Sequence, residues 1–241
     1  MLEHRRLQET GSTNDDAHTA FASGAARPLL ISAEQQTAGK GRYGRSWSHD
    51  PLNFAGSFLV DAGPEACQAP GAVSLLAGLA VRDTLIAEGA DAGALALKWP
   101  NDVLMADEKV AGILSSFVQQ GTDTALIIGI GVNLASPPSE TVFPARAVFA
   151  KDRSPDPEGF GDALGQRLVA LLGRLETSGS WAILEAWRSH AWRLGDDITI
   201  RRDEEEALQG RFEDIDREGR LMLRRADGSL ETIAAGDAAP R

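Results

Sequence analysis

"VLMADEKVAGILSSFVQQGTDTALIIGIGVNL", residues 103–134, is the stretch from which the architecture of this chain can be worked out. Its three apolar runs are separated by two short polar turns, ADE at 106–108 and GTD at 121–123. Turns of two or three residues join antiparallel neighbours. The stretch therefore predicts three consecutive strands of one antiparallel meander.

The segments before this meander predict further strands and a long helix. PLLISAEQQ (28–36), NFAGSFLV (53–60) and ALALKWP (94–100) have the composition of strands. Residues 72–89 place apolar side chains at helical spacing, which predicts a buried helix. Residues 61–70 contain one glycine and two prolines, so a loop is expected there.

The rest of the chain predicts two helices and then a change to short strands. An irregular crossing at 135–157 leads to helices expected at 158–176 and 180–192. From Leu194 onward short apolar runs alternate with turn signals, which predicts a small all-β barrel. We therefore expect an α/β (α+β) fold, a mixed sheet with flanking helices in domain 1–193 and a small β-barrel in domain 194–241.

The composition is that of a globular protein with an acidic charge balance. The 241 residues carry a net charge of −11, whereas proteins that bind duplex nucleic acid use many Lys and Arg. General nucleic acid binding is therefore not expected. The single cysteine, Cys67, excludes an intrachain disulfide and favours a reducing compartment. No secretory leader or membrane span is recognised, so we expect a cytoplasmic protein without membrane association.

The loop AGKGRYGRSW at 38–47 contains the spacing Gly-x-Gly-x-x-Gly, but its context excludes a dinucleotide-binding turn. A Rossmann turn opens directly into a helix, and residues 45–53 have no helical apolar stripe. A Walker A loop is excluded because Glu34 occupies the position of its first glycine.

The same loop combines three glycines with three cations and an indole. The glycines permit unusual backbone shapes, and the guanidinium groups can bind oxygen pairs of an anion. The loop therefore predicts a site that wraps an anionic ligand, with a solvated basic loop as the alternative. The cations and the indole are Lys40, Arg42, Arg45 and Trp47.

Four motifs follow one another along the chain: STN at 12–14, EQQTAGKGRYGRSW at 34–47, LKWPNDVLMADEKVAGIL at 97–114 and GIGVNL at 129–134. Together they closely resemble the motifs of the biotin protein ligases, which biotinylate acetyl-CoA carboxylase and related enzymes. The all-β end of the chain looks like the C-terminal SH3-like domain of these ligases. The resemblance implies a catalytic domain related to those of class II aminoacyl-tRNA synthetases and lipoate ligases.

The resemblance also implies a reaction in two steps. Biotin and MgATP form biotinyl-5′-AMP and pyrophosphate, and a lysine of the biotin carboxyl carrier protein then displaces AMP. ATP, Mg²⁺ and biotin are thus expected, with no permanently bound cofactor. The expected partner is the carrier protein of acetyl-CoA carboxylase or a related carboxylase, and a homodimer is possible in this family. Since the first motif starts at residue 12, we expect the monofunctional class without the N-terminal DNA-binding domain.

The resemblance assigns one group of positions to biotin, a neutral bicycle with an anionic tail. Such a ligand needs apolar walls and a few placed polar groups. For Ser12 and Thr13 the alternative role is capping of the helix that follows them. The positions assigned to biotin are Ser12, Thr13, Asn14, Gln36, Gly39, Lys40, Arg42, Lys109 and Gly112.

A second group of positions is assigned to ATP and the adenylate. Adenylation brings a carboxylate against a phosphate, so cations must offset the repulsion, and Arg42 and Lys109 are the expected catalytic residues. Asp102 offers a Mg²⁺ ligand, although a simple turn at 100–102 and a solvated hairpin lysine remain alternatives. The positions assigned to ATP and adenylate are Arg42, Arg45, Trp47, Asn101 and Asn133, with Trp47 expected to stack on adenine.

One position departs from the family pattern. Residue 40 is lysine where the family usually has arginine, so the charge is kept but the bidentate fork is lost. Two other functions remain open: a lipoate- or octanoate-type protein ligase, and a non-catalytic biotin- or nucleotide-binding module. No Ser-His-Asp or Cys-His constellation is recognised, and activation is expected to come from ATP.

Overall fold

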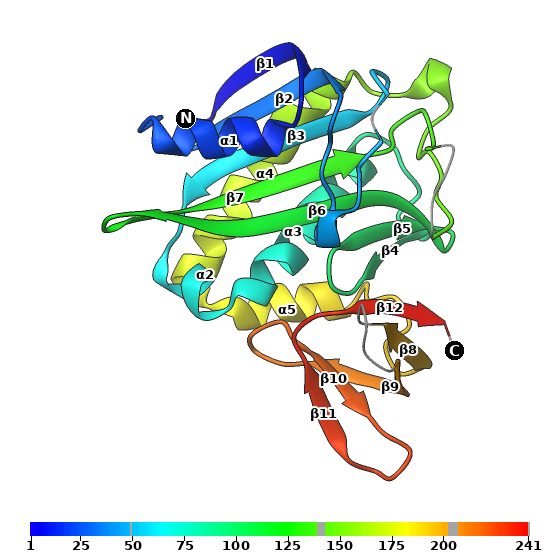
Figure 1. The fold of residues 1–241 in the computed structure, drawn as a ribbon. Coiled ribbons are helices and arrows are strands. Elements are labelled where there is room, and N and C mark those ends of the chain that lie inside the picture. The colour runs from blue at the N-terminus through cyan, green and yellow to red at the C-terminus, as the bar shows by residue number, and fades with distance from the viewer. Residues whose placement is uncertain (49, 139–142, 202–206, 241) are drawn as a thin grey trace.

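The computed structural model describes residues 1–48, 50–138, 143–201 and 207–240, which form two sheets with helices around the larger one (Figure 1). Within these residues the larger sheet has seven strands in the order β1-β2-β3-β7-β6-β5-β4. β1 and β2 are parallel and the other neighbours are antiparallel, so the sheet is mixed as predicted. The strands are β1 (Glu3–Thr10), β2 (Leu29–Gln36), β3 (Phe54–Asp61), β4 (Leu95–Lys98), β5 (Asp102–Met105), β6 (Glu108–Gln120) and β7 (Asp123–Val132).

The predicted meander is confirmed as β5, β6 and β7, paired antiparallel in chain order. The turn between β5 and β6 has positive φ at both central residues, 50° at Ala106 and 65° at Asp107. Two such residues make the tight turn whose twist matches that of a hairpin. This turn brings Lys109, at the start of β6, directly beside the end of β5.

Each face of the larger sheet carries its own hydrophobic core, because the side chains of a strand alternate between the two faces. Leu29 and Ile31 pack with α1 (Thr13–Ala22), whereas Leu30 between them belongs to the core on the other face. Successive side chains of a strand point to opposite faces, so one strand serves both cores. The second face is covered by α3 (Pro70–Ala87) and α4 (Pro157–Ser178), and α5 (Ser180–Arg188) packs against both of these helices.

The long helix expected at 72–89 is α3, and it is the central helix of the larger core. Its 18 residues are apolar enough to pass a hydropathy test for a membrane span, but 67% of that window is buried inside the protein. A core helix that is apolar on all sides has this property. The hydropathy of α3 is therefore accounted for by its contacts with α4 and α5.

The smaller sheet is antiparallel, with the order β11-β10-β9-β8-β12 among the described strands. Its apolar residues, such as Ile200 and Phe212, belong to the same continuous cluster as the core around α3. Trp99 Nε1 donates to Gly219 O at 3.0 Å, which fixes the smaller sheet against the β4–β5 turn. The domain boundary at 193/194 remains a prediction. The strands are β8 (Asp197–Arg201), β9 (Leu208–Ile215), β10 (Leu221–Arg224), β11 (Leu230–Ile233) and β12 (Asp237–Pro240).

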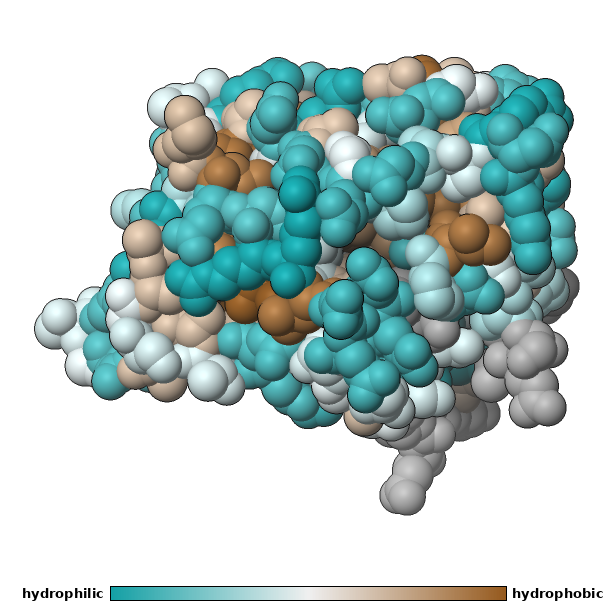
Figure 2. Space-filling view, turned by 90° about the horizontal axis from the view of Figure 1, so that it is seen from above, coloured by the Kyte–Doolittle hydropathy of each residue, from teal (hydrophilic) through white to brown (hydrophobic). Residues whose placement is uncertain are grey.

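Two elements differ from the sequence-based expectations. The segment 61–70 is not a continuous loop, because α2 (Pro64–Gln68) forms there with Pro64 in its first turn. Glu176 accepts from the backbone N–H groups of Glu65 and Ala66, which satisfies the start of α2 from a distant helix. β1 also lies where no strand was predicted from the sequence. β1 lies at the edge of the larger sheet. The surface of the molecule seen from above is largely hydrophilic (Figure 2).

Candidate active site

A cavity of about 530 Å³ opens between the larger sheet, the loop 36–48 and two strands of the smaller sheet. Side chains from the start of α1, from β3 to β7 and from β8 and β12 line it. Gly39 is not part of the lining, but it is buried beside Gln36 and Trp47. The sequence-predicted residues that line the cavity are Ser12, Thr13, Asn14, Gln36, Lys40, Arg42, Arg45, Trp47, Asn101, Asp102, Lys109, Gly112 and Asn133.

One end of the cavity carries uncharged polar side chains. Thr13 donates from its backbone N and its hydroxyl to Gln36 Oε1, at 2.9 and 3.1 Å, and its hydroxyl lies 3.0 Å from Ser57 Oγ. Ser12 is the N-cap residue of α1 by backbone geometry, but its side chain makes no capping hydrogen bond. Asn14 Nδ2 is buried with no hydrogen-bond partner in the part of the chain that the structure describes. A buried amide donor of this kind is costly unless a ligand or water accepts from it.

Glycines of β6 and β7 let the Trp47 indole approach the sheet closely. A Cβ at Gly131 would overlap the indole, and a Cβ at Gly112 would lie 3.1 Å from Trp47 Cζ3. The Lys109 ammonium lies 5.7 Å from the centre of the ring system. Trp47 therefore forms an apolar wall of the cavity at the level of the strands. Stacking of adenine on Trp47 stays a prediction, and it requires the side of the ring that faces away from Gly131.

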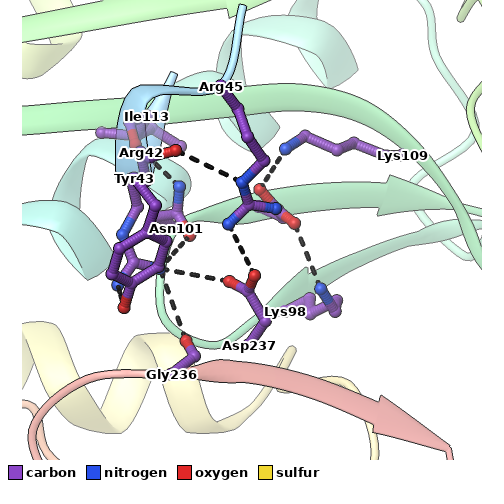
Figure 3. A network of polar contacts seen from close by, with 10 residues as sticks. Arg42, Tyr43, Arg45, Lys98, Asn101, Lys109, Ile113, Gly236 and Asp237 are labelled. Atoms are coloured by element: carbon purple, nitrogen blue, oxygen red, sulfur yellow. Dashed lines mark hydrogen bonds and ion pairs between the residues drawn. The ribbon is translucent and has the colours of Figure 1, made fainter. Parts of the chain in front are cut away.

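A buried carboxylate, Asp102, holds two lysines in the cavity. Lys109 Nζ forms an ion pair with Asp102 Oδ1 at 2.6 Å. Lys98 Nζ lies 3.2 Å from Asp102 Oδ2, and Figure 3 shows both lysines. Burial alone would raise the pKa of Asp102, but the two ammonium groups together outweigh burial and hold this pKa below its ordinary value of 3.8. The cluster of Lys98, Lys109 and Asp102 therefore carries one net positive charge.

Arg42 and Arg45 extend from the loop to the smaller sheet (Figure 3). Arg42 Nη1 donates to Asn101 Oδ1 at 3.0 Å and, at 3.4 Å each, to Gly236 O and Asp237 Oδ1. Arg45 Nη2 donates to Asp237 Oδ2 at 2.6 Å. The two guanidinium groups thus share one carboxylate at the edge of the cavity.

Tyr43 sits between these two arginines in the chain and orients both. Its φ of 56° lies in the left-handed region, which a residue with a large side chain rarely adopts. Its hydroxyl accepts from Arg42 Nη2 at 2.9 Å, and its ring centre lies 4.7 and 5.4 Å from the guanidinium carbons of Arg42 and Arg45. The tight turn therefore places an aromatic face under both cations.

Lys40 and the two asparagines have partners that the motifs alone did not predict. Lys40 Nζ lies 2.6 Å from Asp15 Oδ1 in the first turn of α1, and both side chains are about half exposed. Asn101 Nδ2 donates to Ile113 O at 2.8 Å, so its side chain joins the β4–β5 turn to β6. Asn133 is buried and contacts Lys109 O at 3.5 Å. Both asparagines thus stabilise the strands that carry Lys109.

Four residues of this arrangement were missed at the level of sequence. Lys98 lies within the quoted LKWPND block, yet no role was assigned to it. The ring centre of Phe143 lies 4.5 Å from Lys98 Nζ, and Phe143 lines the cavity. Tyr43 lies within the quoted loop 38–47, but no role was assigned to it, and Asp237 belongs to the distant β12 strand. No local signal marks Phe143 or Asp237 as a site residue.

A Ser-His-Asp arrangement exists outside the cavity, although none was recognised in the sequence. His4 Nδ1 lies 2.6 Å from Asp162 Oδ1, and His4 Nε2 lies 2.7 Å from Ser32 Oγ. None of the three residues lines the cavity. The arrangement joins β1, β2 and α4, so these hydrogen bonds help to hold α4 on the sheet.

The described residues contain no group of three or more His, Cys, Asp or Glu side chains placed to hold a metal ion. Asp102 faces an ammonium group with each of its oxygens. Mg²⁺ usually takes one or two carboxylates and completes its shell with phosphate oxygens and water. The assignment of Asp102 to Mg²⁺ stays a prediction, and a metal ion here would need the phosphates of a nucleotide as its main ligands.

The sequence matches two protein families. The biotin/lipoate A/B protein ligase family matches residues 7–133, and the biotin protein ligase C terminal domain matches residues 194–239. The biotin–acetyl-CoA-carboxylase ligase of Paracoccus denitrificans is 37% identical over 236 residues, which cover 95% of this chain and 97% of the relative.

Solved structures of biotin protein ligases have the same fold. The enzyme of Aquifex aeolicus in complex with biotin and ATP superposes with a TM-score of 0.81 at 23% identity, over 98% of this chain and 97% of the other. The enzyme of Leishmania major in complex with biotinyl-5-AMP superposes with a TM-score of 0.66 at 27% identity, over 97% of this chain and 99% of the other. Both matches span the two sheets, and so support a common arrangement of the whole chain.

Proposed function

The chain belongs to the biotin/lipoate A/B protein ligase family, and we propose that it is a biotin protein ligase that uses ATP to attach biotin to a lysine of a carrier protein. The match of residues 194–239 to the biotin protein ligase C terminal domain favours biotin over lipoate. In the first step the biotin carboxylate attacks the α-phosphorus of ATP and pyrophosphate leaves. In the second step a lysine amine attacks the acyl carbon, loses a proton and releases AMP.

The uncharged end of the cavity suits the polar head of biotin. The ureido group has one carbonyl acceptor and two N–H donors, and the buried Asn14 amide is a donor that lacks a partner among the described residues. Ser12 adds a hydroxyl that is not used as a helix cap. The glycines of β6 and β7, with Trp47, form apolar surface for the rest of the molecule. Gln36 lines the same end, with its Oε1 already bound by Thr13.

The charged end of the cavity suits the adenylation step. The carboxylate of biotin and the α-phosphate of ATP repel each other, and negative charge grows on the phosphate in the transition state. Lys109 and Arg42 lie near enough to this region to offset the repulsion, which is the main electrostatic task of the site. Lys98 supports Lys109, because it neutralises part of the charge of Asp102. Asp102 would be the residue that holds Mg²⁺ beside the phosphates of ATP, where the ion would offset their negative charge, and both oxygens of Asp102 contact lysines in the ligand-free protein.

The partner is a biotin-accepting carrier protein of a carboxylase. We propose the carrier protein of acetyl-CoA carboxylase or of a related biotin-dependent carboxylase, a cytoplasmic location, a possible homodimer and no nucleic acid ligand. The net charge of −11 supports the last of these points. We also propose 1–193 as the catalytic domain and 194–241 as the C-terminal domain.

One observation carries the proposal: polar groups from 12–14 and cations from positions 42 and 109 line a single cavity. The test is ATP–pyrophosphate exchange on the purified protein with biotin, with lipoate or with neither. Exchange that depends on biotin supports the proposal, and exchange with lipoate alone would assign the chain to lipoate ligation. Biotin binding without any exchange would show that the chain is a non-catalytic binding module.

A further inference from the structure

The two loop arginines are bound to a carboxylate of the C-terminal sheet. Asp237 begins β12, which pairs with β8 at the edge of that sheet. Its Oδ2 lies 2.6 Å from Arg45 Nη2, and its Oδ1 lies 3.4 Å from Arg42 Nη1. Gly236 adds its backbone carbonyl 3.4 Å from Arg42 Nη1. Residues that are 192 and 195 positions apart in sequence therefore close one side of the cavity (Figure 3).

Asp237 offers these arginines the same pattern of oxygens that a phosphate offers. A guanidinium group is a planar fork of N–H donors that fits two oxygens of a carboxylate or of a phosphate. Because Asp237 uses Oδ2 for Arg45 and Oδ1 for Arg42, its two oxygens are divided between two forks. A nucleotide phosphate in the cavity therefore competes with Asp237 for the same donors.

We infer that Asp237 is a positioning residue that fastens the loop 38–47 to the C-terminal sheet, and that adenylate formation requires at least one arginine to exchange Asp237 for oxygens of the ligand. The inference rests on the proposed function for the identity of that ligand. Arg42 is the arginine that exchanges, since its contact with Asp237 is the longer one and Asn101 still orients it. In the ligand-free protein Arg45 keeps the loop attached through the shorter contact.

The size of the effect follows from the exposure of the ion pair. The side chains of Arg42 and Asp237, the pair that is exchanged, are 20% and 36% exposed, so water screens part of their attraction. Exposed pairs of this kind change an equilibrium by a factor of about two to five. An interaction that is present only before the ligand binds opposes binding. Its removal must therefore strengthen ligand binding by the same factor by which it loosens the loop.

The test is Asp237→Asn, which keeps the shape of the side chain and removes its charge. The matched control is Asp214→Asn, because Asp214 forms another ion pair between the C-terminal sheet and the catalytic part of the chain, 2.9 Å from Arg188 Nε, and does not touch the loop. Without substrates, tryptic cleavage after Arg42 and Arg45 should be about two to five times faster in Asp237→Asn than in wild type or the control. With biotin and MgATP the three proteins should be cleaved at the same rate.

The kinetic arm measures the KM for ATP in biotin-dependent pyrophosphate exchange. Asp237→Asn should lower this KM by about two- to fivefold, and the control Asp214→Asn should leave it unchanged. An unchanged cleavage rate would overturn the fastening role, and a raised KM would show that Asp237 also holds the arginines in the bound state. Absence of exchange in the wild type would instead refute the proposed function, while the cleavage comparison without substrates would still test the contact.

Discussion

Replacement of Asp102 by asparagine should destabilise the fold, because it leaves a buried ammonium group without its counter-ion. The Asp102 side chain is 10% exposed and lies between Lys98 and Lys109. The Lys98 side chain is only 5% exposed, whereas that of Lys109 is 25% exposed. Asparagine has nearly the same shape as aspartate, so the substitution changes charge and leaves packing almost unaltered.

The expected magnitude follows from the loss of one member of a buried ion pair. Such losses cost about 3–5 kcal/mol, because the remaining charge stays desolvated. For a chain of this size about 1 kcal/mol lowers the Tm by roughly 2–4 °C, so Asp102→Asn should lower it by roughly 6–20 °C. Most of the cost arises at Lys98, since Lys109 can turn toward the water of the cavity. Lys98→Met in the Asp102→Asn background should therefore restore more stability than Lys109→Met in the same background.

The loss of stability in Asp102→Asn should also depend on pH, in the direction set by the lowered pKa of Asp102 in the wild type. A carboxylate whose pKa is lower in the folded protein stabilises the fold above its unfolded pKa, and this contribution is lost as the pH falls through the folded pKa. The difference in stability between wild type and Asp102→Asn should be full at neutral pH. It should shrink below pH 3.8, the ordinary pKa of the group.

The assay is unfolding of the wild type, the single variant and the two double variants, followed by circular dichroism at several pH values. A Tm change of less than about 2 °C for Asp102→Asn at pH 7 would refute the claim that the carboxylate balances a buried charge. Better rescue by Lys109→Met than by Lys98→Met would refute the assignment of the cost to Lys98.

Three further predictions concern the cations of the cavity. Lys40→Arg should preserve pyrophosphate exchange, because Asp15 can pair with either cation, and a loss beyond about a hundredfold would show a specific need for the ammonium. Lys109→Ala should reduce adenylate formation by about a hundredfold with a much smaller change in stability, whereas an equal single-turnover yield would leave Lys109 a solvated hairpin residue. Biotin with MgATP should slow tryptic cleavage after Lys40, Arg42 and Arg45, and equal rates with and without ligands would show that the loop does not close on the site.

The elements that could be predicted from sequence are those with a strong local pattern. The continuous apolar run of β7, which is buried along most of its length, and the tight turn at 106–107 follow from nearest neighbours in the chain. β1 was missed because it is an edge strand rich in charged residues, and its strand character depends on its parallel pairing with β2. α2 was missed because its first N–H groups are satisfied by Glu176, a residue more than 100 positions away.

The same distinction separates the site residues that were predicted from those that were not. Ser12, Arg42 and Lys109 lie in contiguous motifs, so they could be named from sequence. Asp237 has no motif of its own, and its importance comes only from the fold that brings β12 beside the loop. Lys98 was visible in the motif, but its role depends on the shared contact with Asp102.

The charge balance of the cavity differs from that of the whole chain, and this difference limits what composition can exclude. The chain has a net charge of −11, yet the described residues that line the cavity include six cations and only two carboxylates. At physiological ionic strength exposed charges are screened over about 8 Å, so the distant acidic surface contributes little inside the cavity. A duplex would contact that surface over many phosphates and be repelled by it. A single nucleotide, enclosed among the six cations, encounters mainly the local positive charge. An acidic protein can therefore exclude extended polyanions and still bind ATP.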